Sequence, residues 1–161
     1  MLKRNQSLNL AAIALSLCVV VASGSVNAGE SPGDNKSLFN RLGGLMPISV
    51  VVSDFIDELI PDAEMNKNPA IAEARERVPA PYLKYHVTAM VCQATGGPCE
   101  YKGRDMVSSH AHLNITEAEW QRMLVIFKEV LAAHKVPNRE TRELLDIVGS
   151  TKADIVSADK T

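Results

Sequence analysis

The histidines are the residues of this sequence whose types and spacing could support chemistry. His110 and His112 lie in the segment Met106-Val-Ser-Ser-His110-Ala-His112-Leu113. On a helix, Met106, His110 and Leu113 share one face, whereas His112 lies about 200° around from His110 at roughly 100° per residue. We therefore expect His110 to point inward and His112 to face solvent, which argues against a His-x-His metal pair.

Two interpretations of His110 stay open on the residues alone. It is either a core histidine bonded to a carbonyl, or an inward imidazole available as a metal ligand. His86 lies one turn before Met90, at the margin of an apolar helix face. It is either a boundary residue with one solvent-exposed edge, or a second imidazole that reaches the same cavity as His110.

Cys92 and Cys99 flank the sequence Ala94-Thr-Gly-Gly-Pro98, whose turn could bring them together. They form either a disulfide or two separate thiols, and the distance between their Cα atoms decides which. The Gly pair is not typical of a phosphate loop, because it follows a predicted helix and no GKS/T sequence is present. The carboxylates are scattered over predicted solvent faces, and no Ser/His/Asp pattern or HExxH motif supports hydrolase chemistry.

The segments that must position these residues show helical periodicity and no strand alternation. Thr116-x-x-Glu119 is typical of a capping box that opens a long helix, and Pro137 opens the last one. The expected helices are 37–41, a helix through residues 48–59 that Pro61 ends, 70–77, a helix through 83–94, 104–112, a helix from 116 through 134, and a helix from 137 through 148. Such a chain forms one all-α domain.

The first 28 residues are typical of a cleavable signal peptide. Lys3 and Arg4 precede an apolar run from Leu8 to Ala22, and Val26-Asn27-Ala28 resembles a cleavage site. The run is shorter than the roughly 20 residues of a membrane span, although a retained N-terminal anchor is the alternative. We expect a periplasmic or secreted protein, in a compartment where disulfides are allowed.

Composition is consistent with one exported globular domain. The chain has 161 residues, of which 46% are hydrophobic and 22% charged, and its net charge of −2 gives no electrostatic footprint for nucleic acid. Removal of residues 1–28 leaves 15 basic and 19 acidic side chains, a formal charge of −4. We expect a signal peptide at 1–28, a polar leader at 29–36, the domain at 37–156 and a tail at 157–161.

Several short motifs occur in an order and spacing that resemble a known family. They are Leu38-Phe-Asn-Arg-Leu-Gly-Gly44, the second Gly pair Gly96-Gly97, Tyr101-Lys-Gly-Arg-Asp-Met106 with His110 four residues further on, Ile115-Thr-Glu-Ala-Glu-Trp120, and Val136-Pro137. Together they resemble a truncated haemoglobin of group 1, a bacterial-like globin, over residues 37–156. The resemblance implies a two-over-two helical sandwich that holds haem b (iron protoporphyrin IX).

The resemblance also implies roles for single residues. His110 would be the proximal ligand of the haem iron, with Met106 beside it. Ile56, Leu83 and Val87 fall at distal positions where the family usually has Tyr and Gln, so the distal wall would be apolar. His86 falls where some members have a histidine that can bind the iron as a sixth ligand. The last helix lacks the histidine that some relatives attach covalently to haem.

The resemblance implies a protein that binds O₂, NO or CO reversibly, as in oxygen binding or transport. We expect a gas-binding haem protein more than an enzyme. One alternative is a haem enzyme for NO oxidation or peroxide turnover, which would need an unidentified electron donor. Another is a haem-free helical interaction module. We expect no nucleic-acid partner and no stable membrane insertion after signal removal.

Overall fold

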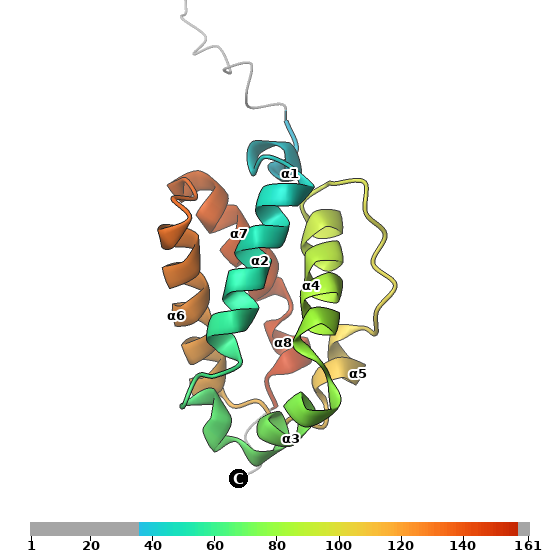
Figure 1. The fold of residues 1–161 in the computed structure, drawn as a ribbon, viewed down its shortest axis with the longest axis vertical. Helices are drawn as coiled ribbons and strands as arrows, with labels where there is room; N and C mark the ends of the chain where they lie inside the picture. Colours follow the sequence, from blue (N-terminus) through green and yellow to red (C-terminus); the bar gives the residue numbers. More distant parts are fainter. Residues whose placement is uncertain (1–35, 158–161) are drawn as a thin grey trace, which may run out of the picture. The chain divides into compact units, whose positions relative to one another are not determined.

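The computed structural model describes residues 36–157, so the predicted signal peptide and most of the leader lie outside the described residues. The described part is helical (Figure 1). Its elements are α1 (Leu38–Arg41), α2 (Leu45–Leu59), the 3₁₀ turn η1 (Met65–Lys67), α3 (Pro69–Arg77), α4 (Ala80–Ala94), α5 (Met106–His110), α6 (Glu117–Ala133), α7 (Asn138–Ser150) and α8 (Lys152–Ile155). Within residues 36–157, no helix is long and apolar enough to cross a membrane.

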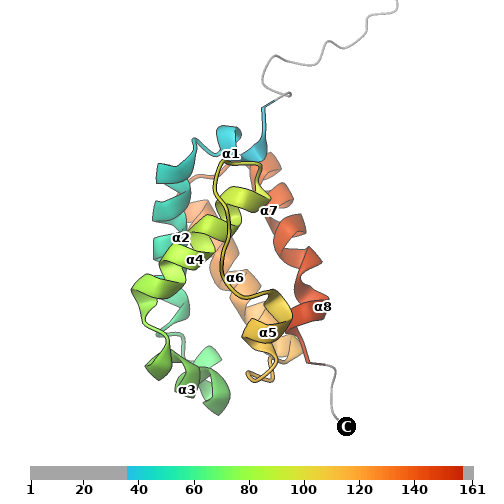
Figure 2. The same cartoon turned by 90° about the vertical axis from the view of Figure 1, so that its right-hand side faces the viewer.

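The long helices form two layers. Helix α2 packs against both α4 and α6, α1 contacts α7, and α5 contacts α8. Figures 1 and 2 show α2 with α4 on one side and α6 with α7 on the other. This arrangement agrees with the all-α two-layer architecture expected from the sequence.

Local signals in the sequence explain where the helices begin. The Thr116 hydroxyl accepts a bond from the Glu119 N–H (3.3 Å), and the Glu119 carboxylate accepts one from the Thr116 N–H (2.7 Å), so the predicted capping box opens α6. The Asn68 side chain caps α3, which begins at Pro69, one residue earlier than predicted. Pro137 is the N-cap of α7.

Helix α5 is shorter than the predicted helix over 104–112. It spans only Met106–His110, because the Asp105 side chain accepts the Ser108 N–H (2.7 Å) and fixes the start. The chain then turns at once: the Leu113 N–H donates to the His110 carbonyl (2.8 Å), and Asn114 adopts a left-handed φ of 49°. The expectation for both ends of this helix was therefore wrong.

The core lies on both faces of α2. Ile48, Val52 and Ile56 are buried, and α4 contributes side chains that pack against them, including Leu83 and Val87. On the other face, Phe55 meets the Phe127 ring of α6 edge-on with centroids 5.2 Å apart. Helix α6 buries five side chains: Trp120, Ile126, Phe127, Val130 and Leu131.

One carboxylate contradicts the expectation that acidic side chains lie on solvent faces. Glu140 of α7 is only 7% exposed, and the Arg41 Nε donates to its Oε1 at 2.9 Å. The same guanidinium also bonds Glu143 and the Lys36 carbonyl, so it ties α1 to α7. The hydrogen bond from Arg41 lowers the pKa of Glu140 below its ordinary value. A buried carboxylate is tolerated here because a charged donor compensates it.

This ion pair makes stability depend on pH. Because the folded pKa of Glu140 is lowered, the pair stabilises the fold above the unfolded value near 4.5 and loses that contribution as pH falls through the folded value. Arg41→Met should lower the melting temperature clearly at pH 7 and by much less at pH 3, as followed by circular dichroism. Arg77→Met is the matched control, because its guanidinium pairs with Glu73 on the exposed surface of α3 and lies outside the Arg41 network. An equal loss for Arg41→Met at both pH values would contradict the assignment.

Candidate functional site

His110 is the last residue of α5, and its ring is oriented by its own helix. The Nδ1 atom lies 2.9 Å from the Met106 carbonyl oxygen, one turn earlier. A carbonyl only accepts hydrogen bonds, so Nδ1 carries the proton and donates. This leaves Nε2 as the unprotonated nitrogen, and no group within residues 36–157 bonds it.

Burial favours the neutral form of the His110 imidazole. The side chain is half-buried, and burial lowers the pKa of His110 below its ordinary value of 6.5, with a smaller opposing effect of the bond to Met106. Electrostatic interactions with His112 and Arg104 lower the pKa of His110 further. A neutral imidazole with a fixed Nδ1–H and an available Nε2 is the form that binds a metal ion.

The neighbours of His110 follow the predicted faces. Met106 and Leu113 are half-buried like His110, whereas His112 is exposed in the turn after α5. Leu113 packs against the buried cluster of Met65, Ile71 and Ile115. The expectation that His112 faces solvent is confirmed.

The three residues expected to form the apolar distal wall lie together. Ile56 of α2 is 3% exposed, and Leu83 and Val87 of α4 pack against its cluster. Ile56 thus lies between α2 and α4, and Leu83 and Val87 of α4, which are half-buried, cover it.

His86 lies in a group of tyrosines that the sequence analysis did not predict. Its ring centroid is 4.2 Å from that of Tyr82, 5.1 Å from Tyr85 and 6.0 Å from Tyr101. These are all three tyrosines of the chain. The spacing of Tyr82, four residues before His86, was a signal for the first contact, whereas the i,i+1 spacing of Tyr85 indicates no contact. Tyr101 comes from another segment, and no local pattern indicates it.

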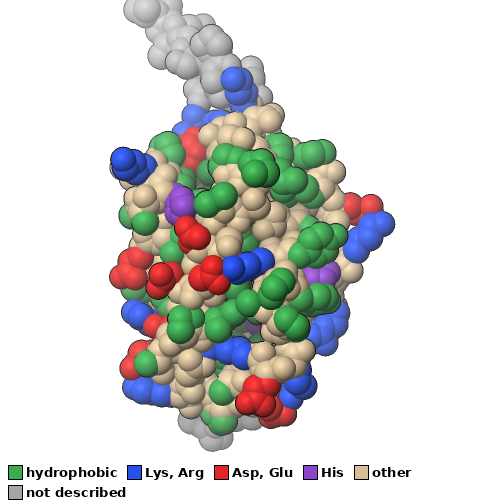
Figure 3. All heavy atoms as spheres, in the orientation of Figure 1, with side chains coloured by type: hydrophobic (Ala, Val, Ile, Leu, Met, Phe, Trp, Pro, Cys, Tyr) green, Lys and Arg blue, Asp and Glu red, His purple; other side chains and the backbone are tan. Residues whose placement is uncertain are grey.

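Exposed apolar and aromatic side chains occur on both α2 and α4. Figure 3 shows hydrophobic side chains gathered on the face that α2 and α4 present. Its exposed members include Leu45, Met46 and Val50 on α2, and Tyr82 and Tyr85 on α4. His86 itself is half-buried, so the ring lies between this surface and the interior.

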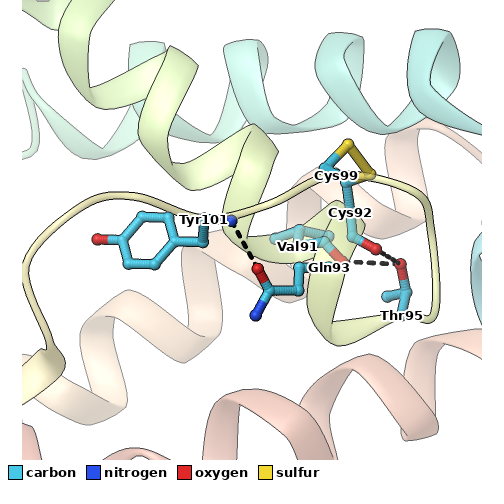
Figure 4. The surroundings of a disulfide bond; sticks show 6 residues. All are labelled: Val91, Cys92, Gln93, Thr95, Cys99 and Tyr101. Carbon is cyan, nitrogen blue, oxygen red and sulfur yellow. Dashed lines mark hydrogen bonds between the residues drawn. A yellow bond between two sulfur atoms is a disulfide. The ribbon is translucent and has the colours of Figure 1, made fainter.

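The segment between α4 and α5 is attached to α4 by a disulfide. Cys92 and Cys99 are bonded, with Cα atoms 5.7 Å apart (Figure 4). A Cβ on Gly97 would lie 2.5 Å from the Phe39 ring and 2.8 Å from the Cys92 carbonyl, so only glycine fits this turn. Further along, the Tyr101 hydroxyl donates to the Arg104 carbonyl (2.8 Å), directly before the N-cap of α5.

Solved structures define the class of fold. Over 76% of this chain and 100% of theirs, the chain superposes on truncated hemoglobin from Tetrahymena pyriformis, Fe(III) form, with a TM-score of 0.67 at 17% identity. The 2/2 hemoglobin from Synechococcus sp. PCC 7002, in the cyanomet state and with covalently attached heme, gives a TM-score of 0.66 at 20% identity, covering 75% and 98% of the two chains. The described residues therefore have the all-helical truncated globin fold.

The sequence identifies the family. Residues 37–157 match the family model described as bacterial-like globin. The chain is 24% identical over 123 residues to Group 1 truncated hemoglobin LI410 of Chlamydomonas moewusii, covering 75% of this chain and 68% of that protein. It is 25% identical over 121 residues to Group 1 truncated hemoglobin GlbN of Nostoc sp. (strain MUN 8820), covering 75% and 98%. The chain belongs to the group 1 truncated haemoglobins, which implies a haem-binding globin.

The residues present fit a haem group. His110 offers a neutral Nε2 whose ring orientation is set by the Met106 carbonyl, and α4 offers apolar side chains such as Leu83 and Val87. A porphyrin needs this combination of one axial nitrogen and an apolar lining. Haem would supply the iron to which a diatomic gas binds, and the protein controls the ligand and the polarity around it.

His110 and His112 can be separated by mutation. His110→Ala should abolish stable haem uptake or the native Soret spectrum, because it removes the only oriented, neutral imidazole of α5. His112→Ala is the matched control, since that side chain is exposed and should be dispensable. Haem titration followed by absorption spectroscopy measures both, and normal uptake by His110→Ala would overturn the assignment.

Proposed function

We propose that this protein is an exported globin that binds O₂, NO or CO reversibly at a haem b iron ligated by His110. The observation that carries the proposal is the His110 ring, whose Nδ1–H is bonded to Met106 and whose Nε2 is left for the iron. One axial histidine keeps the sixth coordination position available for a gas. Because α7 carries no histidine, the haem is held without a covalent bond to that helix.

The apolar distal wall favours fast dissociation of bound O₂. Bound O₂ gains stability from hydrogen-bond donors, and Ile56, Leu83 and Val87 carry none on their side chains. We infer that O₂ leaves faster than from a pocket with Tyr or Gln at these positions. Ile56, Leu83 and Val87 also carry no acid or base that could move a proton during oxygen chemistry, which supports a gas-binding role.

His86 is the polar residue that competes for the sixth position in this proposal. It is carried by α4, the same helix as Leu83 and Val87, and its ring is half-buried. An imidazole beside an open iron site can either bind the iron in the absence of gas or stand back and donate a hydrogen bond to the bound gas. We propose the first option for His86, as an internal sixth ligand in equilibrium with the position among the tyrosines seen in the structure.

Absorption spectra of ferric, ferrous and CO-bound protein test the proposal. A Soret band with a low-spin component in the absence of gas is expected, and His86→Leu should convert that component to high-spin. CO should bind faster to His86→Leu, because no internal ligand has to leave. A matched control is His134→Leu, because His134 is the C-cap of α6 and its Nε2 lies 2.7 Å from the Asp54 carboxylate of α2. Purified protein that takes up no haem would instead favour a helical interaction module.

Export is tested separately. The signal sequence predicts mature protein that begins at Gly29. Mass spectrometry of periplasmic or secreted material should show the loss of residues 1–28, and Ala28→Asp should block that cleavage. Intact protein confined to the cytoplasm would contradict the proposed localisation without affecting the assignment of haem.

A further inference from the structure

The disulfide joins the two segments that carry the candidate haem ligands. Cys92 lies near the end of α4, six residues after His86, and is fully buried. Cys99 lies in the irregular segment that leads to α5 and His110, and is half-buried. The bridge therefore fixes the start of this segment against α4.

Only a few other bonds attach the segment to α4. The Gly97 N–H donates to the Cys92 carbonyl (2.8 Å), and the Tyr101 N–H donates to the Gln93 side chain (2.5 Å). Figure 4 shows Gln93 reaching Tyr101 on one side of the end of α4, with the bridge on another. After Cys99, the main polar contact between this segment and α4 is thus the hydrogen bond from the Tyr101 N–H to the exposed Gln93 side chain.

Tyr101 contacts the surroundings of both candidate haem ligands, His86 and His110. Its ring contacts His86, and its hydroxyl donates to the carbonyl of Arg104, next to the Asp105 cap of α5. A change in the position of Tyr101 therefore alters the surroundings of both histidines. The contact with His86 is the weaker of the two, because it is a ring contact with centroids 6.0 Å apart.

We propose that the Cys92–Cys99 disulfide is a redox switch that controls how much of the haem iron is bound by His86. The proposal rests on the proposed function of His86 and His110. With the bridge closed, Tyr101 and Tyr82 hold the His86 ring in the position seen in the structure. With the bridge open, Tyr101 withdraws, the ring is released from that contact, and His86 binds the iron more often.

A dithiol reductant opens the bridge by two successive thiol–disulfide exchanges. Its thiolate attacks Sγ of Cys99, because Cys92 is fully buried, and a mixed disulfide forms while Cys92 leaves as a thiolate. The second thiol of the reductant then displaces Cys99 and becomes part of the reductant's own disulfide. Two electrons and two protons pass to the protein, which ends with two thiols.

The test compares bridged and unbridged ferric protein produced as residues 29–161, a chain in which Cys92 and Cys99 are the only cysteines. Dithiothreitol treatment should increase hydrogen exchange in peptides covering residues 99–105. It should also raise the ratio of low-spin to high-spin haem by about two- to tenfold, the range expected for loss of one aromatic contact. Cys92→Ser/Cys99→Ser should show the raised ratio without reductant and no further response to it.

Variants of Tyr101 and His86 separate the switch from a general loosening of the fold. Tyr101→Ala should raise the low-spin ratio with the bridge intact, whereas Tyr101→Phe, which keeps the ring, should stay close to the wild type. His86→Leu should remove the spectral response to dithiothreitol. The switch is overturned if the Soret band does not change when the disulfide is reduced. It is also overturned if the change persists in His86→Leu. Either result leaves the proposed globin function standing. Absence of any Soret band ends both proposals.

Discussion

The packing of α2 against α4 determines where every candidate group on α4 can point. Ile48, Val52 and Ile56 bury one stripe of α2, and residues at i, i+4 and i+8 of α4 fill the groove against it: Leu83, Val87 and Val91. Once these three face α2, the helical period places His86 on the flank of α4 rather than in the seam. The half-buried state of the His86 ring is thus a consequence of core packing.

A second constraint is local and acts on α5. A helix of five residues cannot persist by its own propensity, because nucleation costs more than so few hydrogen bonds return. It is stabilised at its start by the Asp105 cap, and backbone bonds lower the pKa of Asp105, consistent with a carboxylate that stays ionised. At its end, the bond from His110 to Met106 closes the single turn. The bond that orients the imidazole therefore also completes the helix that carries it.

The sequence predicted those features that depend on neighbouring residues. Periodicity and end signals located α2, α4, α6 and α7, and the helical face around Met106 separated His110 from His112. Features that depend on distant segments were missed or left open. Glu140 is buried only because Arg41, about a hundred residues earlier, reaches it, and the Cys92–Cys99 bond depends on how tightly the turn at Gly97 closes. Tyr101 meets His86 through the path of an irregular loop, which no periodicity describes.

The size of the disulfide's contribution explains why its effect should be local. The bridge closes a loop with a sequence separation of 7, so its entropic stabilisation is about 2–3 kcal/mol in the chain-entropy model. A domain of this size has a total stability of about 5–15 kcal/mol, which exceeds that contribution. The turn also retains the Gly97 bond to Cys92 and the two bonds from the Thr95 hydroxyl to Val91 and Cys92. Opening the bridge should thus leave α4 and the turn folded. The contact between Tyr101 and His86 involves energies of about 0.5–1.5 kcal/mol, and an equilibrium between two positions of one ring responds to energies of that size.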